Sequence, residues 1–427
     1  MGRHFKHAKV KRSAVNPGVA DAVRAILDDV AENADAAVLR HAVRFDGWQG
    51  DDFRVGPDAI REAARDLPET FKDDFAYAHQ NVSEFARRQR DSLSSFEFEP
   101  EDGVVLGQRV IPVARVGCYV PGGNYPLVAS AMMSIATAKV AGVDYVVAAA
   151  PPKDGRNIHP ATLYAMHHSG ADEIYAMGGV QALAAMAYGC LDIRPVDMIV
   201  GAGNRFVAEA KRQLFGTVGI DLLAGPTEIL VIADDTADPA LVATDLLGQA
   251  EHGEDSPAWL VTSSESLARA VSEEIARQLP ELPTRAVAER AWQDHGEIVL
   301  VDSREEAVAV ADDYAPEHLE LMTADDDWFL ARLRNYGSLF IGQECTVTYG
   351  DKGVGTNHTL PTARAARYTG GLSAAKFLKT VTYQRLDRTA SARMAPVISR
   401  ICEIEGMWAH KKTADIRAER YASTTSA

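Results

Sequence analysis

Short, continuous apolar runs recur along the chain with helix-length stretches between them, and this alternation constrains the fold more than any other feature. The runs are Tyr145–Ala149, Met198–Val200, Ile229–Ile232, Trp259–Thr262, Ile298–Val301 and Ser338–Ile341. Strands that are apolar on both faces are typical of a parallel sheet that helices cover on both sides. The pattern therefore predicts an α/β protein.

The two ends of the chain are expected to be helical. Between about residues 16 and 95, apolar side chains recur at helical spacing, as Ala20, Val23 and Leu27 illustrate. We predict two open, mostly parallel-sheet, incomplete Rossmann-like domains with helical N-terminal and C-terminal segments. The predicted division is a helical part leading into the first α/β domain at 1–118, a second α/β domain at 119–226, the remainder of the first at 227–371 and a helical segment at 372–427.

Charge and composition narrow the classes of function. With 44 Lys and Arg against 60 Asp and Glu, the 427-residue chain carries a formal net charge of −16, so a nucleic-acid partner is not expected. No apolar run approaches the ~18 residues of a membrane-spanning helix, and the basic N-terminus lacks the apolar core of a secretion signal. The four cysteines lie far apart, which disfavours a disulfide framework. We expect a cytoplasmic protein without a membrane partner.

Side chains that can bind a metal are spread along the chain. Gln249 and His252 lie three residues apart, where they would share one face of a helix, and Asp351 follows a glycine in a glycine-rich loop. His410 lies on the C-terminal helical segment. Nitrogen and oxygen ligands without cysteine suit Zn²⁺ or Mn²⁺. Taken singly, each residue is equally explained by packing or by exposure to solvent.

Glu317 and His318 place a carboxyl and an imidazole side by side. Two titratable groups with different pKa values can divide the acid and base roles in one site. The alternative is a helix that begins after Pro316, with Glu317 at the positive end of its dipole. The residues alone favour that alternative.

Two glycine clusters, at 120–124 and 201–204, indicate close approaches to the backbone. The second follows a predicted strand and precedes a helix at 206–214, which is the context of a phosphate site at a helix N-terminus. It lacks the third glycine of the dinucleotide fingerprint, so a simple turn explains it equally well. Cys118 and Cys190 lie in apolar contexts and are interpreted as core residues.

Several ordered segments together resemble the histidinol dehydrogenase family. They are 116–123, 178–182, 203–207, 221–228, 249–253, 316–318, 355–362, 405–406 and 409–411, and they span most of the chain. The resemblance implies that Gln249, His252, Asp351 and His410 hold one Zn²⁺. It places NAD⁺ in the 119–226 domain, against Tyr119, Gln181 and Asn204.

The resemblance also implies a catalytic pair and a dimer. Glu317 and His318 would be the acid/base pair, and the substrate would meet Thr227, Gln249, His252, His318, Lys352, His358 and Glu405. In family members the C-terminal segment reaches into the partner's site, so Glu405 and His410 would act in a homodimer. The implied chemistry is a four-electron oxidation of a primary alcohol through an aldehyde to a carboxylate, with two NAD⁺.

The sequence departs from the biosynthetic members around the pocket. Val347 replaces a glutamate four residues before Asp351, Lys352 replaces a tyrosine after it, and Thr227 replaces a serine. Asn124 and Tyr125 also depart. Losing an anion and gaining a cation favours an anionic substrate over the cationic histidinol. A solvated loop residue is the alternative for Lys352.

Segments 123–127 and 368–372 resemble the sulfopropanediol dehydrogenase branch of the family. Its substrate, 2,3-dihydroxypropane-1-sulfonate, would become 3-sulfolactate by the same double oxidation, and it is a small anionic polyol. Histidinol oxidation is the alternative, and a non-catalytic homologue that binds metal or nucleotide is a remote one.

Overall fold

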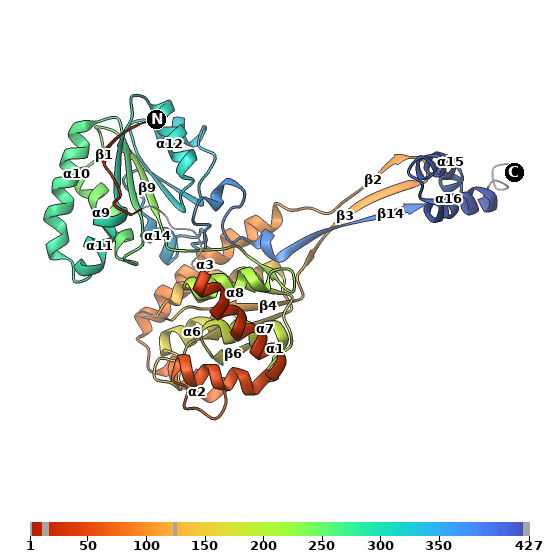
Figure 1. Ribbon diagram of the computed structural model, residues 1–427, viewed down its shortest axis with the longest axis horizontal. Helices are drawn as coiled ribbons and strands as arrows, with labels where there is room; N and C mark the ends of the chain where they lie inside the picture. The colour runs from red at the N-terminus through yellow and green to blue at the C-terminus, as the bar shows by residue number, and fades with distance from the viewer. Residues whose placement is uncertain (1, 11–16, 123–125, 422–427) are drawn as a thin grey trace.

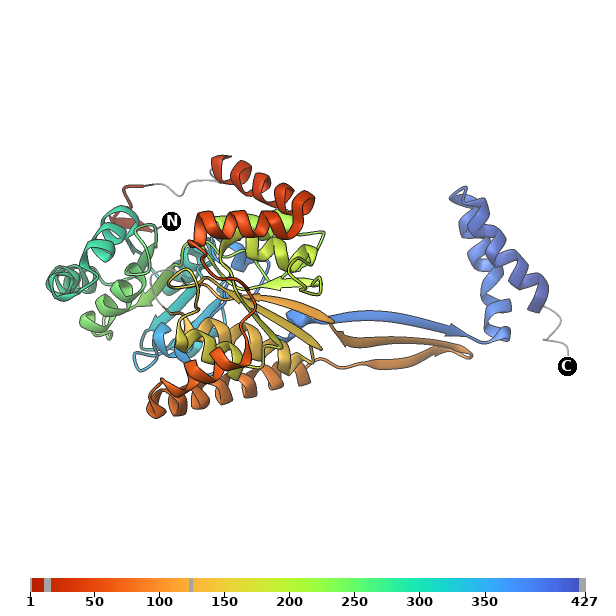
Figure 2. The ribbon, with the colours of Figure 1, turned by 90° about the horizontal axis from the view of Figure 1, so that it is seen from below.

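The computed structural model describes residues 2–10, 17–122 and 126–421, which form two α/β bodies and a projecting arm (Figure 1). Each body has its own sheet, and the arm has a third sheet that ends in a pair of helices (Figure 2). Asn124 and Tyr125 lie outside the described residues.

The first body is built on a five-stranded parallel sheet with the order β6-β5-β4-β7-β8. Its strands are β4 (Arg115–Tyr119), β5 (Tyr145–Ala150), β6 (Glu173–Ala176), β7 (Met198–Val200) and β8 (Gly219–Ile220). Its helices are α1 (Pro17–Asp46), α2 (Pro57–Arg65), α3 (Glu69–Asp91), α4 (Val128–Ala131), η1 (Met132–Ala136), α5 (Thr137–Ala141), α6 (Pro160–His168), α7 (Gly179–Tyr188) and α8 (Arg205–Leu214). Every side chain of β5 is buried, because α1, α7 and α8 lie on one side of the sheet and α3 and α6 on the other (Figure 2).

The second body is built on a six-stranded sheet with the order β1-β11-β10-β9-β12-β13. Its strands are β1 (Arg3–Lys6), β9 (Ile229–Ala233), β10 (Ala258–Thr262), β11 (Glu297–Leu300), β12 (His318–Met322) and β13 (Ser338–Ile341), all parallel except β1. Its helices are α9 (Pro239–Ala250), α10 (Glu265–Gln278), η2 (Leu279–Glu281), α11 (Arg285–His295), α12 (Arg304–Tyr314), α13 (Asp326–Leu330), α14 (Val347–Lys352) and η3 (Ala365–Arg367). Since β1 joins this sheet while α1 to α3 cover the other, residues 1–118 contribute to both bodies.

The arm is a three-stranded antiparallel sheet with the order β14-β3-β2. Its elements are β2 (Phe96–Glu101), β3 (Val104–Pro112), η4 (Ala374–Phe377), β14 (Leu378–Leu386), α15 (Arg388–Ile404) and α16 (Trp408–Tyr421). The sheet carries α15 and α16 away from both bodies, as Figure 2 shows.

The prediction of a wholly helical segment at 372–427 is wrong at its start, because residues 378–386 form β14. β14 pairs with β3 along its whole length, from Leu378 opposite Pro112 to Leu386 opposite Val104. Its centre, Thr380–Tyr383, is rich in β-branched and aromatic residues, which favour strands.

The predicted α/β class with parallel sheets and helices at both ends is confirmed. Each apolar run predicted as a strand is one, and the predicted helical region near the N-terminus forms α1, α2 and α3. None of the helices in the described part of the chain combines the length and apolar character needed to cross a membrane.

Candidate active site

The predicted catalytic and metal-binding side chains of the second body gather where β9 and β12 begin, facing the first body. His318 is the first residue of β12, and Thr227 and Glu228 directly precede β9. Across the gap, Ser130 of α4 has its hydroxyl 3.3 Å from Nε2 of His358. The candidate site therefore lies between the two α/β bodies.

Glu317 precedes β12 and is buried beside Thr227. Its Oε2 accepts hydrogen bonds from the Thr227 hydroxyl, at 2.5 Å, and from the Glu228 amide, at 3.0 Å. These bonds favour the charged form, but burial outweighs them and raises the pKa of Glu317 well above its usual range. The nearby Glu228 and Asp351 carboxylates act in the same direction. Glu317 can therefore hold a proton near neutral pH.

His318 is buried in the opposite protonation state. Its Nδ1 lies 3.0 Å from the Glu228 carbonyl oxygen, which can only accept, so Nδ1 carries the hydrogen. Nε2 is then the unprotonated nitrogen, and it is buried without a hydrogen-bond partner among the described residues. Burial lowers the pKa of His318 to about 4, so the imidazole is neutral at pH 7. An unpaired ring nitrogen of this kind can take a proton from a substrate.

The alternative in which a helix begins after Pro316 is wrong. Ala315, with φ +45°, lies in the left-handed region and ends α12, and the chain continues into β12. Leu319 and Leu321 of that strand are fully buried on the sheet face opposite His318. The interpretation failed because helix dipole and cap signals were weighed without the apolar alternation that follows.

Gln249 lies in the last turn of α9, and its amide is held in a fixed orientation. The amide nitrogen donates to the Thr227 hydroxyl and lies 3.4 Å from Nδ1 of His318. With its nitrogen engaged, the amide oxygen is the atom that remains for a cation. His252 was predicted on the same helix face, but α9 ends at Ala250, and His252 lies in the turn that follows.

Asp351 lies in the last turn of α14 rather than in a glycine-rich loop. The Gly350 beside it is buried within that helix, so the glycine signal reflected close packing. One carboxylate oxygen of Asp351 is 3.9 Å from Nε2 of His318, and its backbone carbonyl accepts a hydrogen bond from Nδ1 of His358, at 3.0 Å. Desolvation lowers the pKa of His252 and of His358, although the Asp351 charge opposes the effect in both.

The side chains at this point fit a divalent metal. An amide oxygen, a neutral imidazole and a carboxylate from Gln249, His252 and Asp351 are donors that zinc accepts. Among the described residues of one chain, no three His, Cys, Asp or Glu side chains form a metal-binding group, so one chain supplies an incomplete set. The predicted fourth ligand, His410, is exposed on α16 of the arm, and Glu405 ends α15 there. Neither lies in the candidate site of its own chain (Figure 2).

The residues predicted to contact NAD⁺ lie in the first body. The Tyr119 hydroxyl, at the end of β4, accepts a hydrogen bond from the Gly179 amide at the start of α7, at 3.1 Å. Gln181 lies in the same first turn. β4 and its neighbours β5 and β7 diverge at this edge, which is where open α/β sheets bind ligands. Asn204 caps α8, since its side-chain oxygen accepts from the amides of residues 206 and 207.

Sequence reasoning missed Asp46, the last residue of α1. Its Oδ2 accepts hydrogen bonds from the Gly178 amide, at 2.9 Å, and from the Gln181 amide nitrogen, at 3.0 Å. Burial raises its pKa. Asp46 and Gln181 are far apart in sequence, and no local motif linked them.

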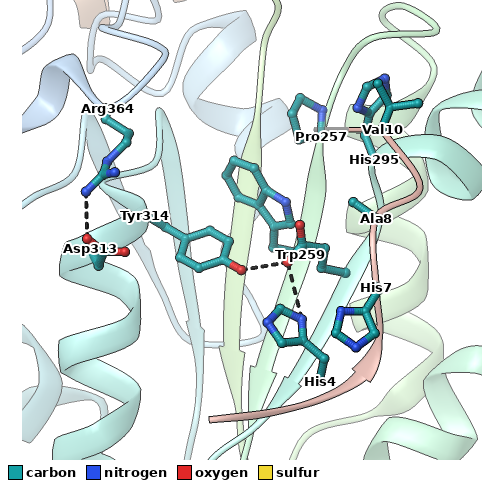
Figure 3. Close-up of a pocket in the computed structure, with 11 residues that line it drawn as sticks. His4, His7, Ala8, Val10, Pro257, Trp259, His295, Asp313, Tyr314 and Arg364 are labelled. Carbon is teal, nitrogen blue, oxygen red and sulfur yellow. Dashed lines mark hydrogen bonds and ion pairs between the residues drawn. The ribbon is translucent and has the colours of Figure 1, made fainter. Parts of the chain in front are cut away.

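A separate pocket of about 370 Å³ lies beside β1 and contains none of the predicted site residues (Figure 3). There Nδ1 of His4 lies 3.5 Å from the Glu297 carboxylate, and the Tyr314 hydroxyl donates to the same carboxylate at 2.6 Å. Arg364 pairs with Asp313 at 2.6 Å. The contacts at Glu297 fasten the N-terminal strand to β11.

Comparisons with known proteins agree with this arrangement of motifs. A family model described as histidinol dehydrogenase matches residues 9–418. A histidinol dehydrogenase homolog of Shouchella clausii is 52% identical over 403 residues, covering 94% of this chain and 95% of that protein. The sulfopropanediol 3-dehydrogenase of Ruegeria pomeroyi is 48% identical over 420 residues, covering 98% and 96%. The chain belongs to the histidinol dehydrogenase family, a family of oxidoreductases.

Two histidinol dehydrogenases extend the likeness. That of Thermus thermophilus is 42% identical over 402 residues, covering 94% of this chain and 95% of that protein. The crystal structure of histidinol dehydrogenase from Elizabethkingia anophelis superposes with a TM-score of 0.90 at 33% identity, covering 97% of this chain and 94% of that chain. The expected family and fold are therefore confirmed.

Proposed function

We propose that the protein is a zinc-dependent, NAD-linked dehydrogenase that oxidises a primary alcohol through an aldehyde to a carboxylate. The observation that carries this proposal is the adjacent pair Glu317 and His318, whose pKa values are moved in opposite directions beside a set of metal donors. Such a pair suits a reaction that needs a base for an alcohol and then a second proton acceptor for water. The family supports the same chemistry.

In the proposed reaction, bound zinc would orient the substrate oxygen while two NAD⁺ would each accept one hydride. Nε2 of His318 takes the hydroxyl proton of the alcohol as the aldehyde forms. Glu317, once deprotonated, takes a proton from the water that adds to the aldehyde, and the hydrate is oxidised to the carboxylate. One alcohol and one water thus yield one carboxylate, two NADH and three protons.

We propose that the substrate is anionic, most specifically 2,3-dihydroxypropane-1-sulfonate, with 3-sulfolactate as product. The charge of Lys352 lowers the pKa of both His252 and His358, so the ammonium lies near enough to influence the candidate site. Val347 brings no carboxylate to offset it. The 48% identity to a sulfopropanediol 3-dehydrogenase supports this choice. Thr227, His358 and Glu405 of the partner complete the proposed substrate contacts.

The alternative substrate is L-histidinol, which would be oxidised to L-histidine. The likeness to the Thermus thermophilus histidinol dehydrogenase favours it. Its cationic amine would meet Lys352 without the carboxylate that position 347 lacks here.

The deciding experiment measures NADH formation from racemic 2,3-dihydroxypropane-1-sulfonate and from L-histidinol with the zinc-loaded protein. We expect turnover of the sulfonate. Lys352→Ala should raise its KM by ~10- to 100-fold with a smaller effect on kcat, because a charge-assisted hydrogen bond is lost. Lys9→Ala, which removes an exposed lysine outside the candidate site, is the matched control. Efficient histidinol turnover would overturn the substrate, and bound zinc without NADH from either alcohol would overturn the enzyme.

A further inference from the structure

Two buried carboxyl groups lie beneath the candidate site and take no part in the proposed chemistry. Glu320 belongs to β12 and is 1% exposed, and Asp245 belongs to α9 and is half-buried. Each interacts electrostatically with the other, and neither has a cationic partner among the described residues. Two such groups in a protein core require an explanation.

The contacts of the pair reach a third element. One oxygen of Glu320, Oε1, accepts a hydrogen bond from the Val347 amide at the start of α14, at 3.0 Å. Asp245 accepts one from the Thr346 hydroxyl, also at 3.0 Å. The other oxygen of Glu320, Oε2, is buried, and no N–H or hydroxyl group of the described residues reaches it.

The neighbour left for Glu320 is therefore the Asp245 carboxyl. Two carboxylates repel one another, whereas a protonated carboxyl group donates to an ionised one. Burial, followed by the Asp245 charge, raises the pKa of Glu320 well above its usual range, and burial raises that of Asp245. One proton held between them satisfies the unpaired oxygen.

The three elements joined in this way are those that carry the proposed site. Asp245 lies four residues, about one turn, before Gln249 on α9, and Val347 lies four residues before Asp351 on α14. Glu320 lies two residues after His318, on the same face of β12. We propose that Asp245 and Glu320 share one proton and act as positioning residues, locking α9, β12 and α14 together so that Gln249, His318 and Asp351 converge. This inference rests on the proposed function.

The test compares zinc affinity, measured by chelator competition, with melting temperature. Glu320→Ala and Asp245→Ala each break the pair and should weaken zinc binding by ~10- to 100-fold, as loss of support around metal ligands does. Glu320→Gln should retain affinity close to that of the parent, because its amide can donate to Asp245 and accept from the Val347 amide. The half-buried Asp245 provides a second break should Glu320→Ala fail to fold.

The matched control is Thr262→Val in β10. Thr262 is 1% exposed, and its hydroxyl accepts from the Ser264 amide in the same sheet, but β10 carries no site residue. This variant should lower the melting temperature without changing zinc affinity. Parental zinc affinity in both alanine variants would overturn the positioning role. A loss in Glu320→Gln equal to that in Glu320→Ala would overturn the shared proton.

Failure of the proposed function gives a different result. If the parent binds no zinc, or if His252→Ala binds it as well as the parent, the metal site itself is wrong and the inference falls with it. If His252→Ala loses zinc while both alanine variants of the pair bind it normally, the inference alone is wrong.

Discussion

Adjacent residues in the candidate site experience opposite electrostatic effects. Burial disfavours whichever form is charged, so it keeps Glu317 protonated and His318 unprotonated. The hydrogen bond from Nδ1 of His318 to the Glu228 carbonyl then fixes which ring nitrogen is the base. The proposed order of proton transfers follows from this difference.

Glu317→Gln should separate the two oxidations. The amide cannot take a proton from water, so acid formation should slow by ~10²-fold or more, while alcohol oxidation through His318 slows much less. Single-turnover measurements with the alcohol and with the aldehyde test this directly. His318→Gln serves as the comparison and should slow the alcohol step. Equal losses of both steps in Glu317→Gln would refute the division.

The two oxidations should also differ in their dependence on pH. A general base works only when deprotonated, so activity falls as the pH drops through its pKa. Because the pKa of Glu317 is raised and that of His318 is about 4, aldehyde oxidation should decline at a higher pH than alcohol oxidation. Zinc content measured at each pH controls for metal loss. A single acid limb shared by both steps would contradict the assignment.

At the scale of elements, the sequence predicted strands that are apolar on both faces but missed those that are not. β9 and β10 were predicted because all their side chains are buried. β2, whose side chains are all exposed, and β14, with most exposed, offer no apolar signal. Their pairing with β3 is a long-range contact that local patterns do not encode.

The same limit applies to the candidate site. Glu317 and His318 are neighbours in the sequence, so their pairing could be proposed from it. Asp46 and Gln181 meet only because α1 packs against α7, and Asp245 meets Glu320 only because α9 packs on the sheet. Those associations required the structure.

The N-terminus of α8 tests whether Asn204 has a second role besides capping. Asn204→Ala removes the acceptor for two backbone amides and should cost ~1 kcal/mol of stability. Asn204→Ser keeps the cap and should melt near the parent, yet bind NAD⁺ about tenfold more weakly if one cofactor hydrogen bond is lost. Isothermal titration and thermal melting together decide this. Parental NAD⁺ affinity in Asn204→Ser would leave the residue with its capping role alone.

At the scale of the whole molecule, the arm exposes an apolar surface. Its members lie on or next to α15 and α16 and include Val397, Ile398, Ile401, Ile404, Met407 and Trp408. Ile404 is 90% exposed and Trp408 is 64% exposed. A concentration of exposed apolar side chains is typical of an interface. It supports the proposed homodimer in which His410 and Glu405 serve the partner's site.

Mixed dimers test that exchange. His252→Ala and His410→Ala should each be inactive alone, because each removes one proposed zinc ligand. If His410 acts in the partner's site, a dimer of one variant with the other contains one intact site. Co-refolded variants in equal amounts should then regain about a quarter of the parental activity, since half of the dimers are mixed and each has one working site of two. Two samples of the same variant, refolded alike, are the control, and no recovery in the mixture would exclude exchange.

The position of the arm also has a consequence for how the protein matures. On the proposed arrangement, the last donor of each metal site lies in the final residues to leave the ribosome, and it serves another chain. A newly made monomer would then offer zinc only Gln249, His252 and Asp351 and would hold it weakly. Metal loading would follow pairing, so zinc content would report how many chains have found a partner.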